Sequence, residues 1–205
     1  MGDKTNEIED SIKIILLGES GVGKTNLINV FFGFGFDKNT ETTLSSYCYD
    51  GEFSHKNKTY SYSIWDTAGQ EKFRAINKMF IRDAKIIFIV YSIDNKYSFD
   101  EVDFWVNFVK ENLGTQKYIM ALVANKCDLY EDQMVMDDEG QNAANKYGIE
   151  FITTSAFTNI ITFKNFVYEL LNRYIEMSLG HDIRKNIVKI NNDKKDTKQK
   201  KCCSK

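Results

Sequence analysis

The chain has 205 residues, of which 42% are apolar and 27% are charged, and its formal net charge is −2. These proportions suit one packed domain with a modest appendage and exclude a globally disordered chain. The longest apolar stretches are too short to span a bilayer, the N-terminus is too polar for a secretory signal, and four cysteines without a CxxC spacing exclude a disulfide scaffold or a zinc module. We therefore expect a soluble intracellular protein.

The first part of the chain is predicted to contain one buried strand, one helix and a hairpin. Ile12–Leu17 is a short apolar run that suits a buried parallel strand, and a helix is expected at Lys24–Phe32. Bulky residues then alternate with smaller or polar ones in two runs, residues 47–53 and 60–64. With Lys56-Asn57 between them, these runs predict an antiparallel hairpin.

The second part alternates strands with helices. Lys85–Tyr91 and Tyr118–Ala124 are apolar runs of strand length. Between them, Ser98-Phe-Asp-Glu101 has the form of a capping box, and apolar residues then recur at helical spacing as far as Leu113. The remaining predicted elements are a helix at Glu139–Tyr147, a strand at Glu150–Thr153 and a helix at Ile160–Met177. This alternation predicts an α/β fold with a largely parallel sheet and ligands at the carboxyl ends of its strands.

A glycine-rich motif directly follows the first predicted strand. Gly18-Glu-Ser-Gly-Val-Gly23-Lys24-Thr25 matches the full GxxxxGK[ST] pattern of a phosphate-binding loop. Its glycines let consecutive backbone N–H groups turn toward phosphate oxygens, and the following helix adds its positive end. Lys24 supplies a positive charge for the β- and γ-phosphates, and the Thr25 hydroxyl is an oxygen ligand for Mg²⁺. Kinases and ATPases share this loop, so it does not identify the base.

Two further segments lie where a base is expected. Asn125-Lys126-Cys127-Asp128 ends the fifth predicted strand, and Thr154-Ser155-Ala156 follows the sixth. The Asp128 carboxylate can accept hydrogen bonds from N1–H and the amino group of guanine, an arrangement that adenine does not present. Backbone N–H groups of the second segment can contact the guanine oxygen. Together with the phosphate loop, these segments predict a guanine nucleotide site.

The segment after the hairpin is predicted to complete the phosphate side of the site. It reads Asp66-Thr-Ala-Gly69-Gln70-Glu71. Asp66 can hold Mg²⁺ through a water molecule, Gly69 can bring a backbone N–H close to the γ-phosphate, and Gln70 can orient the attacking water. A simple turn without a ligand is the alternative interpretation of this segment.

These motifs together resemble one protein family. GESGVGKT, WDTAGQE, NKCD and TSA, in this order and spacing, are similar to the motifs of the Ras-like small GTPases and, among these, of the Rab family. KFRAI, FIRDA and IVYSID are close to segments typical of Rabs, and the resemblance extends from Ile12 to Met177. It implies a P-loop NTPase fold of three layers, in which helices flank a mostly parallel six-stranded sheet with one antiparallel strand.

The resemblance also implies roles for individual residues. Thr43 corresponds to the threonine that reaches Mg²⁺ and the γ-phosphate, Phe36 lies edge-on to the guanine, and Lys126 covers one face of it. Ser20 stands where a small residue leaves room for hydrolysis. The expected catalytic residues are Lys24, Thr43 and Gln70, and the expected metal ligands are Thr25, Thr43 and Asp66. The expected nucleotide-binding residues are Ser20, Gly21, Val22, Gly23, Lys24, Thr25, Asn26, Phe36, Thr43, Gly69, Asn125, Lys126, Asp128, Ser155, Ala156 and Phe157.

The chain departs from the Rab pattern at several positions. Leu44–Cys48 replaces the usual Ile-Gly-Val-Asp-Phe, so the aromatic triad that Rab effectors read, here Cys48, Trp65 and Phe80, lacks its first member. Phe157 stands where the family has the lysine of Ser-Ala-Lys, so an aromatic ring is expected to stack on the guanine from that side. The remaining departures are Thr40 in place of an aromatic residue and Asp83 in place of a glycine. None of these changes removes a metal, phosphate or base ligand.

The C-terminal segment differs in charge from the rest of the chain. Residues 181–205 carry nine Lys or Arg and three Asp, a net charge of +6, which leaves −8 for the rest and does not suit a nucleic-acid-binding domain. Cys202-Cys203 resembles the CCxx ending that receives two geranylgeranyl groups in Rabs, and two lipid chains anchor a protein stably to a membrane. The expected parts are a flexible N-terminus (1–10), a small GTPase domain (11–178) and a flexible basic hypervariable tail with the prenylation motif (179–205).

The resemblance implies a membrane-anchored switch that binds GTP or GDP with Mg²⁺, hydrolyses GTP slowly and recruits effectors in vesicle trafficking. Its expected partners are a guanine nucleotide exchange factor, a GTPase-activating protein that supplies an arginine, a Rab escort protein or GDP-dissociation inhibitor (GDI), a geranylgeranyl transferase and effectors. We expect a monomer without nucleic acid, on the cytoplasmic face of endosomal or other intracellular membranes, and cytosolic when complexed with GDI. Two alternatives stay open, a scaffold that binds GTP without useful hydrolysis and a P-loop ATPase or kinase of a different class.

Overall fold

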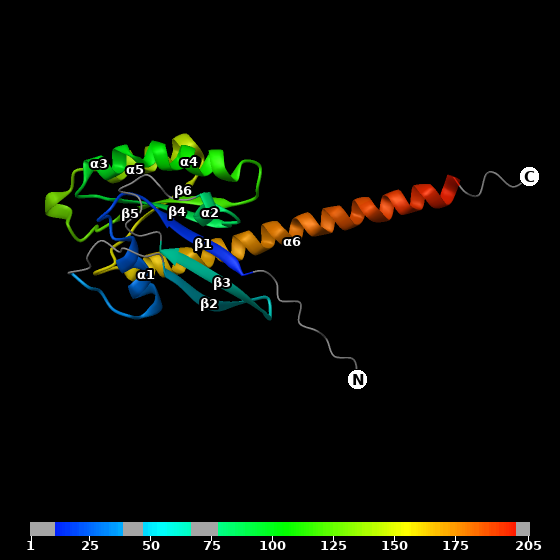
Figure 1. Ribbon diagram of the computed structural model, residues 1–205, viewed down its shortest axis with the longest axis horizontal. Helices are drawn as coiled ribbons and strands as arrows, with labels where there is room; N and C mark the ends of the chain where they lie inside the picture. The colour runs from blue at the N-terminus through cyan, green and yellow to red at the C-terminus, as the bar shows by residue number, and fades with distance from the viewer. Residues whose placement is uncertain (1–10, 39–46, 67–77, 200–205) are drawn as a thin grey trace, which may run out of the picture.

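Six strands form one sheet in the computed structural model, which describes residues 11–38, 47–66 and 78–199 (Figure 1). The strands are β1 (Ile12–Leu17), β2 (Tyr47–His55), β3 (Lys58–Asp66), β4 (Ile86–Ser92), β5 (Ile119–Asn125) and β6 (Glu150–Thr153). Their order across the sheet is β2-β3-β1-β4-β5-β6. β2 is antiparallel to β3 and all other neighbours are parallel, which confirms the predicted mostly parallel sheet with one antiparallel strand.

Helices cover both faces of this sheet. The described helices are α1 (Lys24–Phe32), α2 (Lys78–Ile81), α3 (Lys96–Asp100), α4 (Val102–Leu113), α5 (Asp137–Tyr147) and α6 (Ile160–Gln199), with a short 3₁₀ turn at Tyr130–Asp132. In Figure 1, α3, α4 and α5 lie along one face of the sheet, while α1 and the first part of α6 lie along the other. The predicted three-layer α/β fold is therefore confirmed.

The residues of β1 explain why the sheet is covered on both faces. Ile14 and Leu16 belong to the core that the sheet shares with α1 and α6, whereas Ile15 and Leu17 belong to the core shared with α4 and α5. All four side chains are fully buried, because successive residues of a strand point to opposite faces of the sheet. A continuous apolar run therefore forms a central strand.

The position of β1 in the sheet also places a ligand site. β3 lies on one side of β1 and β4 on the other, so the chain turns in opposite directions from this strand. In open α/β sheets, ligands bind at the carboxyl ends of the strands beside such a point. The predicted phosphate loop leaves β1 at this place.

Several residues other than glycine adopt a left-handed backbone. Lys56 and Asn57 have φ values of 48° and 64°, as expected for a two-residue hairpin turn whose twist matches its strands. The turn of the predicted hairpin is therefore confirmed. Asp83, which replaces a glycine of the Rab pattern, has a φ of 62°. A glycine at this position would adopt the conformation without strain.

The predicted capping box at Ser98 is wrong. The helix α3 begins at Lys96, and the side chain of Asn95 accepts a hydrogen bond from the Ser98 backbone N–H (3.1 Å), so Asn95 is the N-cap. The Ser98 hydroxyl instead donates to the Asn95 carbonyl (2.7 Å) and accepts from the Ser92 backbone N–H (3.0 Å). Asn and Ser are both favoured at N-caps, and the capping-box pattern predicted Ser98 where the structure has Asn95.

The last helix is longer than predicted. Its predicted range is Ile160–Met177, whereas α6 continues to Gln199 and projects from the body in Figure 1. No proline occurs in the chain, and a single interior glycine such as Gly180 costs a helix only about 1 kcal/mol. The flexibility of the tail at 179–205 stays a prediction. Within the described residues, no helix combines the length and the apolar character that crossing a bilayer requires.

Candidate nucleotide-binding site

The loop between β1 and α1 curls around the ammonium group of Lys24. Gly18 has a φ of 142°, and a Cβ there would collide with the Val90 carbonyl on β4, so only glycine lets the loop pass β4 this closely. Lys24 begins α1, is 5% exposed, and donates from Nζ to the carbonyl oxygens of Gly18 (2.7 Å) and Glu19 (2.9 Å). A lysine charge and a helix N-terminus thus lie at one loop, an arrangement that binds phosphate groups.

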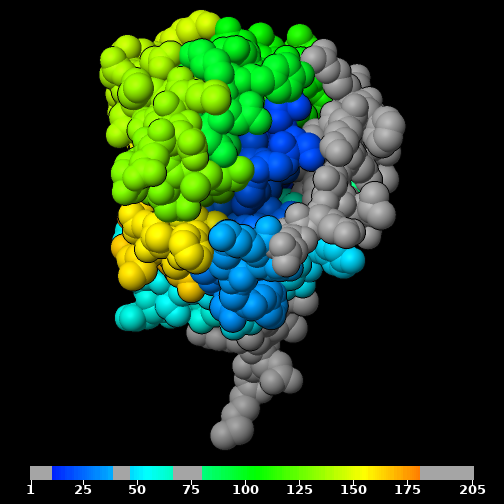
Figure 2. All heavy atoms as spheres, turned by 90° about the vertical axis from the view of Figure 1, so that its left-hand side faces the viewer, coloured from blue at the N-terminus to red at the C-terminus, as the bar shows by residue number. Residues whose placement is uncertain are grey.

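This loop lies at the floor of a hollow. Figure 2 views the molecule from the left-hand side of Figure 1, and the dark-blue atoms of the chain from β1 toward α1 are recessed there. The light-blue atoms after α1 and the yellow-green and yellow atoms from the segments after β5 and β6 form its walls. The hollow therefore opens at the carboxyl ends of the parallel strands, where the fold predicts a ligand.

Thr25 and Asp66 bring two oxygen atoms together beside the phosphate loop. Thr25 Oγ1 donates to Asp66 Oδ2 (2.8 Å), and Asp66, the last residue of β3, is fully buried. Mg²⁺ takes oxygen ligands, and it is commonly bound by one or two protein side chains together with phosphate oxygens and water. The oxygen atoms of these two residues fit the ligand preference of such an ion. Thr43, the third expected ligand, lies outside the described residues.

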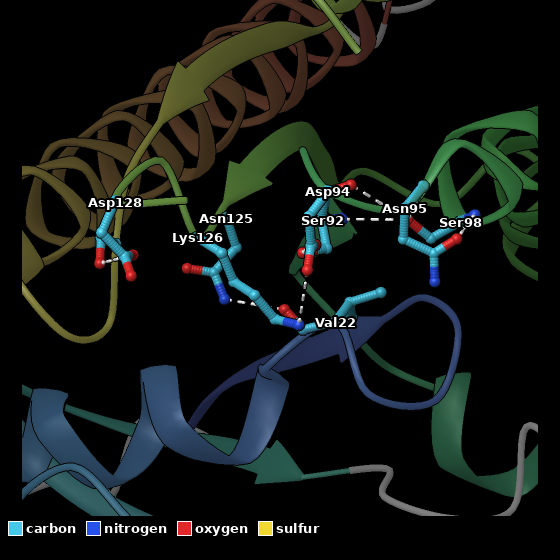
Figure 3. Close-up of polar contacts among 9 residues, drawn as sticks. Val22, Ser92, Asp94, Asn95, Ser98, Asn125, Lys126 and Asp128 are labelled. Carbon is cyan, nitrogen blue, oxygen red and sulfur yellow. Dashed lines mark hydrogen bonds and ion pairs between the residues drawn. The ribbon is translucent and has the colours of Figure 1, made fainter. Parts of the chain in front are cut away.

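Asn125 joins the phosphate loop to the loop that follows β6, and Figure 3 shows its contact with Val22 of the phosphate loop. It ends β5 and is 1% exposed. Its Nδ2 donates to the Val22 carbonyl (2.8 Å), and its Oδ1 accepts from the Ala156 backbone N–H (3.3 Å). A Cβ on Gly23 would collide with this amide, so a glycine is required where Asn125 reaches the loop. One amide thus holds the phosphate side and the base side of the site together.

The Ser155 hydroxyl organises the loop after β6. It donates to Oδ1 of Asp128, and it accepts from the backbone N–H groups of Phe157 and Thr158, each at 3.0 Å. Ser155 is fully buried, so water does not compete for these bonds. The contact holds the carboxylate that is predicted to bind the base in one orientation.

Lys126 turns the chain between Asn125 and Asp128. Its backbone is left-handed, with a φ of 62°, and its side chain extends past the phosphate loop toward the loop after β4 (Figure 3). There its Nζ lies 3.7 Å from Oδ2 of Asp94. Sequence reasoning missed Asp94, although its place two residues after β4, at the same edge of the sheet, was a usable signal.

Two partly exposed aromatic rings meet beside the base loop. The ring centroids of Phe36 and Phe157 are 5.0 Å apart, at an interplanar angle of 48°. Asn26 ties the segment that carries Phe36 to α1, because its side-chain amide donates to the Asp37 carbonyl (2.9 Å) and accepts from the Asp37 N–H (3.1 Å). Asn26 therefore positions the loop of Phe36, a role that sequence reasoning did not find.

The thiol of Cys127 lies inside the base segment but does not suit nucleophilic chemistry. It is partly buried, and burial raises the pKa of the thiol, with the neighbouring Asp128 raising it further. A thiol with a raised pKa stays protonated at neutral pH, and only the thiolate is a strong nucleophile. Cys127 is therefore a packing residue of the site.

The predicted effector triad lies on the β2–β3 side of the molecule. Cys48 is exposed and pairs in register with Trp65 across the hairpin. The rings of Trp65 and Phe80 are 6.4 Å apart in an edge-to-face arrangement. The structure thus brings these three positions close together, but a thiol stands where the Rab triad has its first ring.

The structure brings most of the predicted nucleotide-binding residues to one edge of the sheet. Ser20–Asn26 lie between β1 and α1, Asp66 ends β3, Asn125–Asp128 follow β5, and Ser155–Phe157 follow β6. The predicted residues that lie outside the described part of the chain are Thr40, Thr43, Gly69, Gln70, Cys202 and Cys203.

Comparison with known families agrees with this geometry. The sequence model of the Ras family matches residues 13–176. The match covers the six strands, apart from the first residue of β1, and both loops that carry the predicted phosphate and base contacts.

Proposed function

The chain belongs to the Ras family of small GTPases, and on that basis we propose that it is a Rab-like switch. In this proposal it binds GTP or GDP with Mg²⁺, hydrolyses GTP slowly and recruits effectors during vesicle trafficking. Two prenyl groups on Cys202 and Cys203 anchor it to the cytoplasmic face of an intracellular membrane.

The observation that carries the nucleotide part of the proposal is the connection through Asn125. A phosphate loop alone occurs in kinases and ATPases, and an aspartate after a strand is common. Here a single buried amide bonds both the phosphate loop at Val22 and the base loop at Ala156. A ligand with phosphates at one end and a purine at the other fits this arrangement, and Asp128 favours guanine over adenine.

Several residues of this chain have separate roles in the proposed hydrolysis. Lys24 and the backbone N–H groups of the phosphate loop stabilise negative charge on the phosphates, and Gln70 orients the attacking water. Thr25, Thr43 and Asp66 would hold a bound Mg²⁺, which would supply positive charge to the phosphates. No arginine of this chain stands in a recognisable finger position, so we expect an activating protein to supply one.

The Rab assignment rests on sequence features. The FIRDA and IVYSID segments and the CCSK ending are similar to those of Rabs, whereas Leu44–Cys48 differs from the Rab pattern. The proposed partners are an exchange factor, an activating protein, an escort protein or GDI, a geranylgeranyl transferase and effectors. The basic run at Lys194–Lys201 adds attraction to anionic cytoplasmic leaflets.

The first experiment is to denature the purified chain and to identify any released nucleotide by chromatography. We expect guanine nucleotide in near-stoichiometric amount from the wild type, and little from Asp128→Ala. An adenine nucleotide would favour a P-loop ATPase or kinase instead, and an empty site would contradict tight binding of a guanine nucleotide. Single-turnover hydrolysis then separates a switch from a scaffold. The wild type should turn over on the order of 10⁻⁴ s⁻¹, and Gln70→Leu should be slower, whereas equal rates would favour the scaffold.

A further inference from the structure

The side chain of Lys126 is fixed at both of its ends. At the backbone end, the left-handed conformation (φ 62°) and the hydrogen bond from the Leu129 N–H to the Lys126 carbonyl (2.9 Å) set the direction of the side chain. At the far end, Nζ lies 3.7 Å from Oδ2 of Asp94. Figure 3 shows the stem extended between these points, beside Val22 of the phosphate loop.

Asp94 is itself held from behind by buried groups. The Ser92 hydroxyl donates to Oδ1 of Asp94, which leaves Oδ2 turned toward Lys126. The Ser92 backbone N–H in turn donates to the Ser98 hydroxyl (3.0 Å), which donates to the Asn95 carbonyl (2.7 Å). Ser92 and Ser98 are each 1% exposed. The loop after β4 therefore holds the Asp94 carboxylate in a fixed position.

We propose that Asp94 is a positioning residue for nucleotide binding and acts through Lys126. This inference rests on the proposed function, in which the stem of Lys126 covers one face of the guanine. A free lysine stem samples many rotamers and loses this freedom when a ligand orders it. By pairing with the ammonium group, Asp94 orders the stem before the nucleotide arrives and keeps it in place while the nucleotide is bound, so the bound base is retained longer.

The expected size of the effect on nucleotide release follows from the exposure of the Lys126–Asp94 pair. The side chains of Lys126 and Asp94 are 32% and 24% exposed, so water and salt screen their attraction in part. Ion pairs of this kind change an equilibrium by about two- to fivefold. We expect a change of the same size in the rate of nucleotide release.

The test loads the full chain with Mg²⁺ and a fluorescent GDP analogue and follows its release into excess unlabelled GDP. Asp94→Ala should release the analogue about two- to fivefold faster than the wild type at low salt, and the difference should shrink in high salt. Asp94→Glu should restore most of the slow release. Asp100→Ala makes the same charge change on α3, six residues further on, and should release at the wild-type rate.

Two further variants separate positioning from a structural role. Asp94→Asn keeps an acceptor for the Ser92 hydroxyl but loses the charge, so it should release as fast as Asp94→Ala while its urea midpoint stays that of the wild type. Adding Asp94→Ala to Lys126→Ala should not accelerate release further. Additive effects of these two changes, or a salt-independent one, would overturn the inference.

The same experiment distinguishes this inference from the proposed function. A wild-type chain that retains no GDP analogue would overturn both. A wild-type chain that retains it, while Asp94→Ala releases it no faster than Asp100→Ala, would overturn the role of Asp94 alone.

Discussion

Asn125 shows how one side chain can set the relation between two halves of a ligand site. Its amide donates to a carbonyl of the phosphate loop and accepts from an N–H of the base loop. Both bonds are buried, so their loss would leave polar backbone groups that water does not reach. The amide therefore stabilises the fold and the site through the same two contacts.

We predict that Asn125→Ala lowers the free energy of unfolding by about 2 kcal/mol, because it leaves the Val22 carbonyl and the Ala156 N–H without this partner in the interior. Urea unfolding of the full chain measures this loss. Asn112→Ala is the matched control, since among the described residues the Asn112 amide donates only to the Phe108 carbonyl within α4, and it should cost about 0.5 kcal/mol or less. Equal losses in the two variants would contradict the bridging role.

At the scale of secondary-structure elements, the local sequence pattern predicts an element correctly where one interaction determines it. Ile12–Leu17 forms β1 as predicted because a continuous apolar run can only be buried on both faces. Glu150–Thr153 forms β6 with its predicted bounds. At Ser98 two capping residues compete, and the choice depends on Ser92, which belongs to another element. Such a contact is not visible in a local pattern.

The residues of the candidate site also fall into two groups, those that a local pattern predicts and those that it does not. Lys24, Thr25 and Asp128 could be predicted, because their motifs combine a residue type with a position after a strand. The roles of Asn26 and Asp94 could not, because each depends on a partner that only the folded chain brings near, Asp37 and Lys126 respectively. Sequence therefore predicts the groups that are expected to touch the ligand better than the groups that hold them in place.

The cap of α3 gives a test at this scale. The Asn95 side chain accepts from the Ser98 N–H (3.1 Å), so Asn95→Ala should lower the free energy of unfolding by about 1 kcal/mol. Asn95→Asp keeps an accepting oxygen and should remain within about 0.5 kcal/mol of the wild type. Urea unfolding at neutral pH measures both. If the aspartate variant lost as much as the alanine variant, the stabilisation would not come from the cap.

At the scale of the whole molecule, three exposed lysine–carboxylate hydrogen bonds join separate elements within the described part of the chain. Lys146 pairs with Asp103 between α5 and α4 (2.7 Å), Lys96 with Glu139 between α3 and α5 (2.7 Å), and Lys56 with Glu176 between the hairpin turn and α6 (2.9 Å). In each pair the hydrogen bond from the lysine lowers the pKa of the carboxyl group. All three pairs are exposed, so each is weak by itself, and protonation of the carboxyl groups would remove their contributions as the pH falls.

The pair between α4 and α5 gives a pH prediction with a defined sign. Its lysine, Lys146, holds the pKa of Asp103 below the ordinary value, so the pair stabilises the fold above about pH 4 and this contribution is lost as the pH falls through the lower folded pKa. Lys146→Met removes the partner of Asp103. The free energy of unfolding of this variant should therefore fall less than that of the wild type between pH 6 and pH 3. The urea midpoint as a function of pH measures this difference.

The matched control for the pH prediction is Lys117→Met, which removes the same charge from an exposed position just before β5. A general effect of net charge would change the pH dependence of both variants equally, because each lowers the positive charge of an acidified chain by one. A specific pair between Asp103 and Lys146 would change the pH dependence of Lys146→Met alone. High salt should reduce the difference between the two variants, since the screening length falls to about 3 Å at 1 M ionic strength. Parallel pH profiles at low salt would show that Asp103 and Lys146 do not stabilise the packing of α4 against α5.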